Sequence, residues 1–371
     1  MAKTAEVIEL MGKIAPTHLA EDWDNVGLQV GDLSQEVENV LLALDFNQQL
    51  LAEALEKKCQ LIITHHPFIF NGIKSVDAQN ESGKLIYRLI KNNISLFSAH
   101  TNLDIADGGL NDYLIKKLDV ADISILKTTE SQNYYKLVTL FPEASFKEVR
   151  DALYAKGAGK YNNYSHSGFY QQGTGTFKAL ENSDPYLGQK KSYNEVNEYK
   201  FEAIVSPKNL DKVINTLLKV HPYEEPAWDL YQLGNLKNKK GIGRVADLRE
   251  ETELESLIAK IKEKYQLEHL KVVKAKNKIK RIALCSGSGA DFIKDAYYQG
   301  ADLYLTGDVK FHEAQRAEEL GISLIDFGHY GSEKFVRELL FDRLNAEAST
   351  KLKKELNFIK SSVNTDPWDY Q

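Results

Sequence analysis

Short apolar runs alternate with amphipathic helical patterns at both ends of this chain, and this alternation restricts the fold more than any other feature. In the first third, NVLLALD is followed by QQLLAEALEKK, QLIIT by KLIYRLIKNN, and ISLFSAH by GGLNDYLIKKL. In the last third, KRIALCSGSG, ADLYLTGD and ISLIDFGHYG each precede a helical pattern in the same way. Strands that alternate with helices are typical of α/β layer architectures. We therefore expect an α/β/α domain built from both ends of the chain.

The middle of the chain has a different pattern. From about residue 130 to 235, the segments predict a strand, a helix, a loop with a hairpin, another strand and another helix. Two β-α units with β-rich material between them favour a small ferredoxin-like α+β module. Since 371 residues exceed one typical domain, we interpret residues 128–235 as an inserted domain. It splits the α/β domain into residues 1–127 and 236–371.

The composition is that of a folded, soluble protein, with 43% hydrophobic and 27% charged residues. The formal net charge of −6, without a long Lys/Arg block, argues against a nucleic-acid partner. No apolar run approaches the roughly 18 to 20 residues that span a bilayer, and the N-terminus lacks a signal-peptide pattern. We therefore expect a cytoplasmic protein without membrane association. Only Cys59 and Cys285 occur, which excludes a thiolate zinc cluster and leaves histidines and carboxylates as metal ligands.

The histidines are unevenly placed along the sequence. Of nine histidines, four come just after a predicted strand: His65, His66, His100 and His329. In open α/β sheets, ligands bind outside the carboxyl ends of the strands, so residues at several such ends can meet in one crevice. A single histidine at a strand end is more often a hydrogen-bonded structural residue. The hypothesis of a functional site therefore depends on three strand ends converging.

Those strand ends together offer a metal-ligand set. His65, His66 and His329 supply nitrogen atoms, and Asp104 and Glu333 supply oxygen atoms. Imidazoles with carboxylates suit zinc, iron, manganese, cobalt or nickel better than calcium or magnesium. Five or six such groups are enough for two ions about 3.5 to 4 Å apart that share a bridging carboxylate or water. Adjacent histidines on an extended backbone point to opposite sides, so the first two can face two metals, or one metal if the chain turns at Pro67.

The local placement of the last two groups can also be predicted. Gly328 and Gly331 disfavour a continuous helix before Ser332. We therefore expect His329 in a strand-to-helix loop and Glu333 in the first helical turn, with Ser332 as the cap.

Other segments are weaker candidates for chemistry: the glycine-rich residues 285–291; Asp308, His312 and Glu313; Trp23, Asp24 and Asn25; and His221, Glu224 and Glu225. The amides of the glycine-rich segment could bind a phosphate, although a tight turn explains the glycines more readily. A helix cap and a solvated helix face are the alternative for the group at 308–313. We interpret the segment at 23–25 as a turn and the segment at 221–225 as a rigid loop.

With these residues assembled, the sequence resembles the Nif-three-like (NGG-interacting factor three-like) family, whose members are often labelled GTP cyclohydrolase I type 2 homologues. The matching motifs are WDNVGLQVGD, ITHHPFIF, SAHTNLD, GIGR, SGSG, LTGDVKFHEA and DFGHYGSE, and they occur in both halves of the split domain. In the middle segment, GTGTF, DPYLG and HPYEEPAWDLY look like the PII/CutA-like domain inserted in the longer bacterial members.

This resemblance implies a dinuclear metal centre and a toroidal homohexamer. The ligands would be His65, His66, Asp104, His329 and Glu333, all of which are present. His100 matches the HTNLD motif and is expected beside the ligands as a catalytic proton shuttle. We expect two divalent ions, zinc first, with iron, manganese, cobalt or nickel as alternatives.

The leading functional hypothesis is a metal-dependent hydrolase that acts on a small, nucleotide-like substrate. Hydrolysis at C8 of a purine ring and hydrolysis of a phosphoester would use the same pair of ions, and the sequence does not choose between them. The alternative is a non-catalytic metal-binding hexameric assembly, in which the inserted domain binds a regulatory ligand or a partner. A DNA-associated factor is disfavoured by the acidic composition.

Overall fold

The computed structural model describes residues 1–352 and 355–369; the C-terminal end of the predicted domain, Gln371, lies outside the described residues. The chain separates into two compact units. Unit 1 contains residues 1–129 and 240–371, and unit 2 contains residues 130–239. The chain passes between the units within two long strands, β7 (Val120–Pro142) and β10 (Trp228–Glu253). The domain boundaries at 127/128 and 235/236 stay a prediction from the sequence.

Four strands from the N-terminal part of unit 1 and one strand from its C-terminal end form a five-stranded sheet. Its order is β15 (Asn357–Lys360), β4 (Asn39–Ala43), β5 (Leu61–Thr64), β6 (Ser95–Ser98) and β2 (Gly27–Val30). Only β2 is antiparallel to its neighbour. The near-continuous apolar runs of β4 and β5 are typical of parallel strands buried on both faces. Strands β1 (Ala2–Lys3) and β3 (Glu36–Val37) form a separate antiparallel ladder of two strands.

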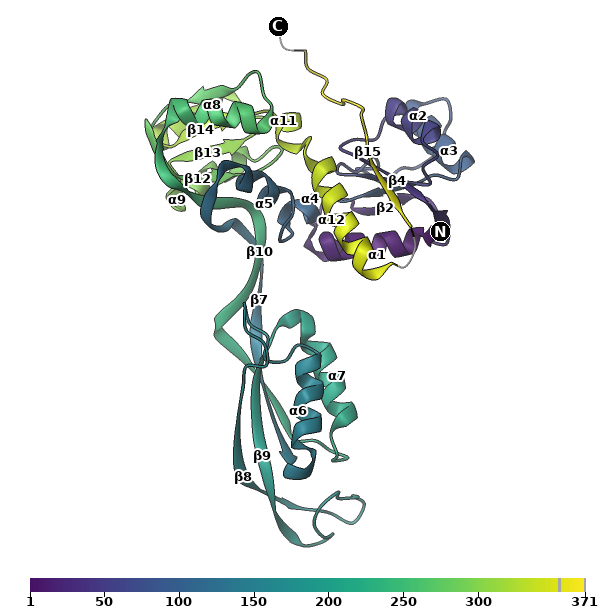
Figure 1. Ribbon diagram of the computed structural model, residues 1–371, viewed down its shortest axis with the longest axis vertical. Coiled ribbons are helices and arrows are strands. Elements are labelled where there is room, and N and C mark those ends of the chain that lie inside the picture. Colours follow the sequence, from purple (N-terminus) through teal and green to yellow (C-terminus); the bar gives the residue numbers. More distant parts are fainter. Residues whose placement is uncertain (353–354, 370–371) are drawn as a thin grey trace. The chain divides into compact units, whose positions relative to one another are not determined.

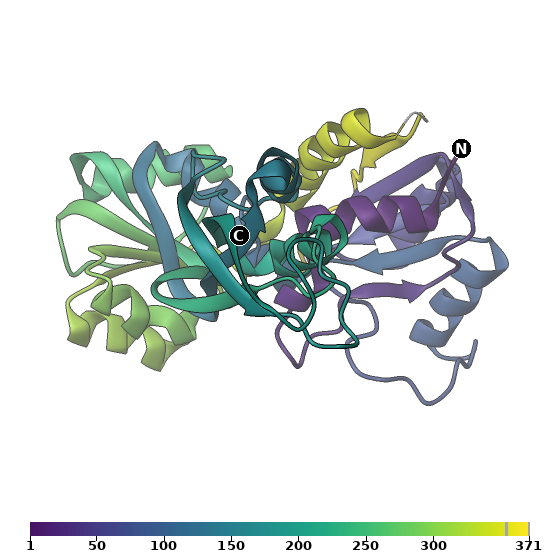
Figure 2. The same ribbon diagram turned by 90° about the horizontal axis from the view of Figure 1, so that it is seen from below.

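Helices cover both faces of this sheet (Figures 1 and 2). Side chains of Leu41 and Ile62 pack in one cluster with α2 (Gln48–Glu56) and α3 (Glu81–Lys91). Alternate residues of the same strands face the other way and pack with α1 (Thr4–Ile14) and α12 (Val336–Lys351). In Figure 2 the purple α1 and the yellow α12 lie on the same side of the sheet. The strand alternation therefore divides the core into two layers.

The C-terminal half of unit 1 builds a second sheet around three parallel strands, β12 (Lys278–Leu284), β13 (Leu303–Thr306) and β14 (Ser323–Asp326). The antiparallel strand β11 (Lys271–Val273) flanks β14, and β10 pairs antiparallel with β12. One face packs against α8 (Leu254–Tyr265), and the other against α9 (Ile293–Tyr298) and α10 (Phe311–Leu320). One buried cluster contains residues from both sheets, so unit 1 has a continuous core.

Short helices connect the strand ends to this core: α4 (Thr101–Ile105), α5 (Leu110–Ile115) and α11 (His329–Glu333). The α/β architecture expected from the sequence is confirmed. What the alternation did not indicate is that unit 1 contains two separate sheets, the first of which also takes up the C-terminal strand β15. No helix in the described part of the chain has the length and apolarity needed to traverse a bilayer.

Unit 2 has the element order strand, helix, two strands, helix, strand. Its parts are the end of β7, α6 (Phe146–Ala155), β8 (Gly168–Lys178), β9 (Tyr193–Val205), α7 (Leu210–Val220) and the start of β10. Strand β9 pairs antiparallel with both β7 and β8. The two helices pack with Phe141 and Phe201 in one core. This order is that of a ferredoxin-like module, while the relation to PII/CutA-like domains stays a prediction.

A buried ion pair holds the start of the second sheet against α5. The guanidinium of Arg244, 3% exposed, donates to Asp112 through Nε at 2.8 Å and Nη2 at 2.9 Å. Its Nη1 donates to the carbonyls of Gly241 and Gly243 at 2.9 and 2.8 Å. Burial would raise the pKa of Asp112, but Arg244 outweighs it and lowers that pKa. The GIGR motif therefore has a structural role at the point where the chain re-enters unit 1.

We predict that Arg244→Ala lowers the free energy of unfolding of unit 1 by about 3 to 5 kcal/mol, because it leaves the Asp112 carboxylate buried without its partner. Urea denaturation followed by circular dichroism measures this change. Arg249→Ala is the control, since Arg249 and Asp119 form an exposed pair at 3.0 Å that is worth about 1 kcal/mol or less. Equal losses in the two variants would contradict the assignment.

We also predict that Glu53 anchors the C-terminal segment in a pH-dependent way. Burial would raise the pKa of Glu53. Hydrogen bonds donated to its carboxylate by Lys57, Ser361 and Ser362 outweigh burial and lower the pKa to about 2. Because the folded-state pKa is depressed, this stabilisation is present above pH of about 4.5 and is lost as pH falls toward 2. Glu53→Gln should therefore unfold more easily than wild type at pH 7 and equally easily near pH 2. A constant difference across this range would contradict the prediction.

Candidate metal centre

Three connections of unit 1 bring the predicted ligands together. His65 and His66 directly follow β5, Asp104 lies on α4 beyond β6, and His329 and Glu333 lie on α11 beyond β14. The His66 ring centroid is 5.2 Å from that of His65 and 5.3 Å from that of His329. Side chains from the carboxyl ends of strands in both sheets thus lie in one cluster, while their ligand role stays a prediction.

The carboxylate of Glu333 lies between two groups of donors. Its Oε2 is 2.9 Å from Nε2 of His66 and 3.0 Å from Nε2 of His329. Its Oε1 is 3.8 Å from Nε2 of His65, which is also 3.7 Å from Oδ1 of Asp104. Oε2 of this carboxylate therefore faces two imidazoles and Oε1 faces a third, an arrangement that would allow the carboxylate to bridge two cations.

Each of these imidazoles is oriented through its other nitrogen. Nδ1 of His65 is 2.8 Å from the carbonyl of Ala99, which accepts only if Nδ1 carries the proton. Nδ1 of His66 is 2.7 Å from Oδ1 of Asp45. Nδ1 of His329 is likewise 2.7 Å from Oδ2 of Asp308. This arrangement directs Nε2 into the cluster, where its lone pair can bind a metal once Nε2 has lost its proton, as in metal-binding histidines.

The residues present fit a divalent transition-metal ion. Nε2 of His65 is buried and has no hydrogen-bond partner among the described residues. Such atoms cost free energy unless something binds them. Two groups have ligand atoms within 4.8 Å of one another: His65, His66 and His100, and His66, His329 and Glu333. Nitrogen with carboxylate oxygen suits zinc, iron, manganese, cobalt or nickel, and these clusters could hold such ions.

The charges in the cluster stabilise one another. Burial would raise the pKa of Glu333, but the surrounding imidazoles outweigh burial and hold that pKa well below its ordinary value. Burial would lower the pKa of His66, yet Asp45 and Glu333 raise it to about 10. The pKa of His329 rises to about 9 because Glu333 and Asp308 outweigh burial. Burial, with Glu333 nearby, raises the pKa of Asp104. A cation bound here must displace protons from the imidazoles.

His100 lies directly beside this cluster and is oriented by Asp24. Its Nδ1 is 3.0 Å from Oδ1 of Asp24, and the amide of Thr101 donates to Oδ2 at 3.0 Å. The ring centroid of His100 is 5.1 Å from that of His65. The geometry admits His100 as a ligand or as a proton carrier. Asp24 was interpreted from the sequence as a turn residue, and that interpretation missed its contact with His100.

The placement predicted for α11 was wrong. His329 is the first residue of this helix and Glu333 the last, so both lie on one helical turn. Ser332 donates from Oγ to the carbonyl of His329 at 2.7 Å and does not cap the helix through its side chain. A five-residue helix tolerates Gly331 because tertiary contacts hold it: a Cβ there would come within 2.8 Å of Leu267.

The glycine-rich segment 285–291 supports the cluster from one side. The amides of Ser286, Gly287 and Gly289 donate to side-chain oxygens of Asn111, Ser332 and Thr306. These amides are therefore engaged within the protein, which favours the tight turn over a phosphate site. Gly287 has φ +64°, and a Cβ there would lie 2.3 Å from Oε1 of Glu333. Glycine at 287 thus lets the backbone approach the Glu333 carboxylate.

The remaining weaker candidates divide between the site and the surface. Asp308 belongs to the site through its contact with His329. His312 is exposed and bonds to Gln315, and Glu313 accepts from the amide of Lys310 as a helix cap. Asn25 bonds to the carbonyl of Ile69, in the loop after the site histidines. Asp45 was missed, although it lies two residues after the end of strand β4, close to the strand-end position that identified the histidines.

The HPYEEPAWD segment lies in unit 2 and has a structural role there. Nε2 of His221 is 2.8 Å from the carbonyl of Leu140, and Nδ1 accepts from the amide of Tyr223 at 3.1 Å. Glu224 accepts from the amide of Asp184. The rigid-loop interpretation fits these contacts.

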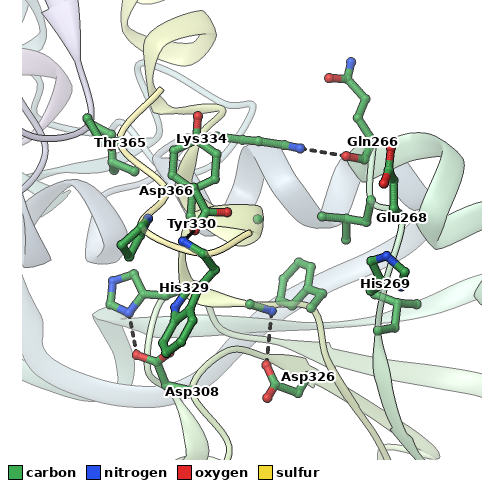
Figure 3. Close-up of a pocket in the computed structure, with 18 of the residues that line it drawn as sticks. Gln266, Glu268, His269, Asp308, Asp326, His329, Tyr330, Lys334, Thr365 and Asp366 are labelled. Carbon is green, nitrogen blue, oxygen red and sulfur yellow. Dashed lines mark hydrogen bonds and ion pairs between the residues drawn. The ribbon is translucent and has the colours of Figure 1, made fainter. Parts of the chain in front are cut away.

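A cavity of about 1030 Å³ opens onto the cluster at His66 and His329 (Figure 3). The loop Gln266–Lys271 forms one part of its wall, and the C-terminal residues Thr365–Trp368 form another. Thr365 donates from its hydroxyl to Oδ2 of Asp45, the carboxylate that orients His66. The wall and the cluster are therefore joined by hydrogen bonds, and the volume suits a small molecule.

Comparisons with known proteins agree with one another. Residues 2–367 match the family described as Duf34/NIF3 (NGG1p interacting factor 3). The chain is 38% identical to a Listeria innocua protein called GTP cyclohydrolase 1 type 2 homolog, over 100% of this chain and 99% of the relative. A Bacillus subtilis protein of the same name is 36% identical, with 100% of each covered. The crystal structure of a Bacillus cereus protein related to NIF3 aligns with a TM-score of 0.91 at 34% identity, covering 100% and 99% of the two chains.

We predict that the protein binds about two zinc ions per chain. His329→Ala should retain about one, because His65 still faces both Asp104 and Oε1 of Glu333, and Glu333→Gln should retain none. Elemental analysis after dialysis measures the content. His312→Ala, an exposed histidine outside the cluster, is the control and should match wild type. Unchanged zinc content in Glu333→Gln would contradict the bridging role.

We predict that Gly287→Ala weakens zinc binding by about 10-fold or more, because its Cβ would displace the Glu333 carboxylate. Competition with a chromophoric chelator measures the affinity. Gly12→Ala is the control, since a Cβ at Gly12 meets nothing within 4 Å. Equal affinities for the two variants would show that close approach at Gly287 is not required.

Proposed function

The chain belongs to the Duf34/NIF3 (NGG1p interacting factor 3) family, and on this premise we propose that it is a dinuclear metal-dependent hydrolase of a small, nucleotide-like substrate. The observation that carries the proposal is the position of Glu333, whose two oxygens face different imidazoles, two of which, His66 and His329, line a cavity of about 1030 Å³. The relatives called GTP cyclohydrolase 1 type 2 homolog support a substrate with a purine-like ring.

Five residues would hold the ions. His65, Asp104 and one oxygen of Glu333 form the first ligand group, and His66, His329 and the other oxygen form the second. When bound, two divalent cations, zinc first, lower the pKa of water and polarise the substrate. Asp45 and Asp308 hold the imidazoles in the orientation that presents Nε2.

His100 is the proposed proton carrier. Asp24 holds Nδ1 of this imidazole, so Nε2 faces the cluster and can accept or donate a proton at the reacting atom. Trp23 lies edge-on to the same ring, with centroids 6.0 Å apart, and restricts its rotation. The cavity wall excludes bulk water from part of this space, which strengthens the charge interactions there.

The test of this proposal is turnover by zinc-loaded protein against a panel of purine bases, nucleosides and nucleotides. Turnover should disappear in a His65→Ala, His66→Ala double variant and persist in His312→Ala. Zinc bound in full with no turnover on any member of the panel would overturn the hydrolase.

We predict that His100→Gln lowers kcat by about 100-fold or more while zinc content stays unchanged. Asp24→Asn should also lower kcat, with a smaller effect, because the imidazole remains but its tautomer is no longer fixed. Steady-state kinetics with parallel elemental analysis separates the two roles. Loss of zinc in His100→Gln would instead identify His100 as a ligand.

The alternative is a non-catalytic metal-binding assembly in which unit 2 binds a ligand or a partner. One observation favours it: unit 2 exposes large aromatic side chains, including Tyr164 at 74%, Phe169 at 61% and Tyr193 at 67%. Exposed aromatics of this kind often mark binding surfaces. A homohexamer, as the family resemblance implies, belongs to both proposals. Native mass spectrometry tests it directly, and a monomer at micromolar concentration would exclude it.

A further inference from the structure

The cavity beside the metal centre is rich in carboxylates. Among its lining residues, five are acidic and two are lysines: Asp45, Glu268, Asp308, Asp326 and Asp366, and Lys271 and Lys334. Figure 3 shows Glu268, Asp308, Asp326 and Asp366 around the same space. Charge in a cavity wall selects the charge of the molecule that enters.

Most of this charge is already matched inside the wall. Asp45 faces His66 at 2.7 Å and Asp308 faces His329 at 2.7 Å. Lys271 pairs with Asp326 at 3.0 Å, so neither contributes net charge to the cavity. Of these seven charged side chains, three have not yet been paired: the ammonium group of Lys334 and the carboxylates of Glu268 and Asp366.

Lys334 is poorly placed as an anion receptor. Its Nζ donates to the carbonyl of Gln266 at 2.8 Å. The carboxylate of Asp366 lies near enough to interact electrostatically with this ammonium group and compensates its charge. The wall therefore offers no surplus cation to a polyanionic ligand.

Bound ions would not reverse this balance. Two divalent cations bring four positive charges, and four carboxylates surround them: Asp104 and Glu333 as ligands, and Asp45 and Asp308 on the imidazoles. With neutral imidazoles the loaded centre is close to neutral, and the remaining wall is slightly negative. A chain of phosphates would gain little attraction here beyond direct coordination.

The apolar part of the wall suits a flat ring. Trp368 lies at the cavity and is 71% exposed, so its indole face is accessible to a ligand. Tyr330 lines the same space, together with Leu44, Leu267 and Leu270. Indole and phenol rings stack on planar heterocycles without requiring charge.

We propose that this cavity selects a planar heteroaromatic compound with little negative charge, a nucleobase or nucleoside rather than a nucleoside triphosphate, and that the ring stacks on Trp368. This inference rests on the proposed function, since it names the substrate class of the same centre. The proposed substrate class therefore differs from the nucleotide GTP, which the name of the relatives suggests.

Isothermal titration calorimetry on the full-length, zinc-loaded protein tests the inference with guanosine and GTP as probes. Guanosine should bind at least as tightly as GTP. Trp368→Ala should weaken guanosine binding by about 10-fold or more, while Tyr298→Ala, which removes an aromatic ring 79% exposed and outside the cavity, should not. Elemental analysis after each titration shows whether GTP has removed zinc, and circular dichroism shows that each variant is folded.

A second set of substitutions tests the effect of the negative charge in the cavity wall. Glu268→Gln with Asp366→Asn should raise the ratio of GTP affinity to guanosine affinity severalfold, since each change removes a negative charge and keeps the side chain's size. Glu318→Gln, on the exposed side of α10, is the control and should change neither affinity.

Three results would overturn the inference: GTP binding at least 10-fold tighter than guanosine, guanosine affinity unchanged in Trp368→Ala, or no binding of guanosine at all. Failure of the proposed function looks different. Guanosine binding that depends on Trp368, without turnover of any base or nucleoside, would refute the hydrolase and leave the inference standing. Turnover of GTP alone would support a hydrolase and refute the inference.

Discussion

The site in unit 1 is organised around one buried carboxylate that requires positive charge beside it. Glu333 is 2% exposed and lies among three imidazoles. A carboxylate in such a place is costly unless cations or protonated bases surround it. Imidazoles alone can supply this charge only by holding protons, as the raised pKa values of His66 and His329 indicate. Divalent cations supply it without protons, and they would also bind the otherwise unpartnered Nε2 of His65.

The two sheets and their connections serve this requirement. The first sheet supplies His65 and His66 at the end of β5, and the second supplies α11 at the end of β14. Asp104 comes from α4, and the Arg244–Asp112 pair fixes the adjacent helix α5 to the start of the second sheet. The shared buried cluster then packs the two sheets together, which brings their strand ends into one site. Precise positioning of ligands is thus a property of the core as well as of the site.

The sequence predicts the strands and the residues at their ends well, because each is a local pattern. Apolar runs such as Leu61–Thr64 and the histidines after them can be recognised without tertiary information. The one-turn helix that carries His329 and Glu333 could not be predicted, because its glycines disfavour a helix locally and tertiary contacts decide its formation. The contact between Asp24 and His100 was equally inaccessible, since 76 positions separate the two residues. The second sheet, the close approach of Gly287 and the acidic cavity are likewise products of tertiary structure.

The central claim is that two cations lie on either side of the Glu333 carboxylate. Anomalous scattering from crystals of the zinc-loaded protein, measured at the zinc edge, tests it most directly. The account predicts two anomalous peaks about 3.5 to 4 Å apart, one beside His65 and Asp104 and the other beside His66 and His329. A single peak, or peaks only at surface histidines such as His312, would contradict it.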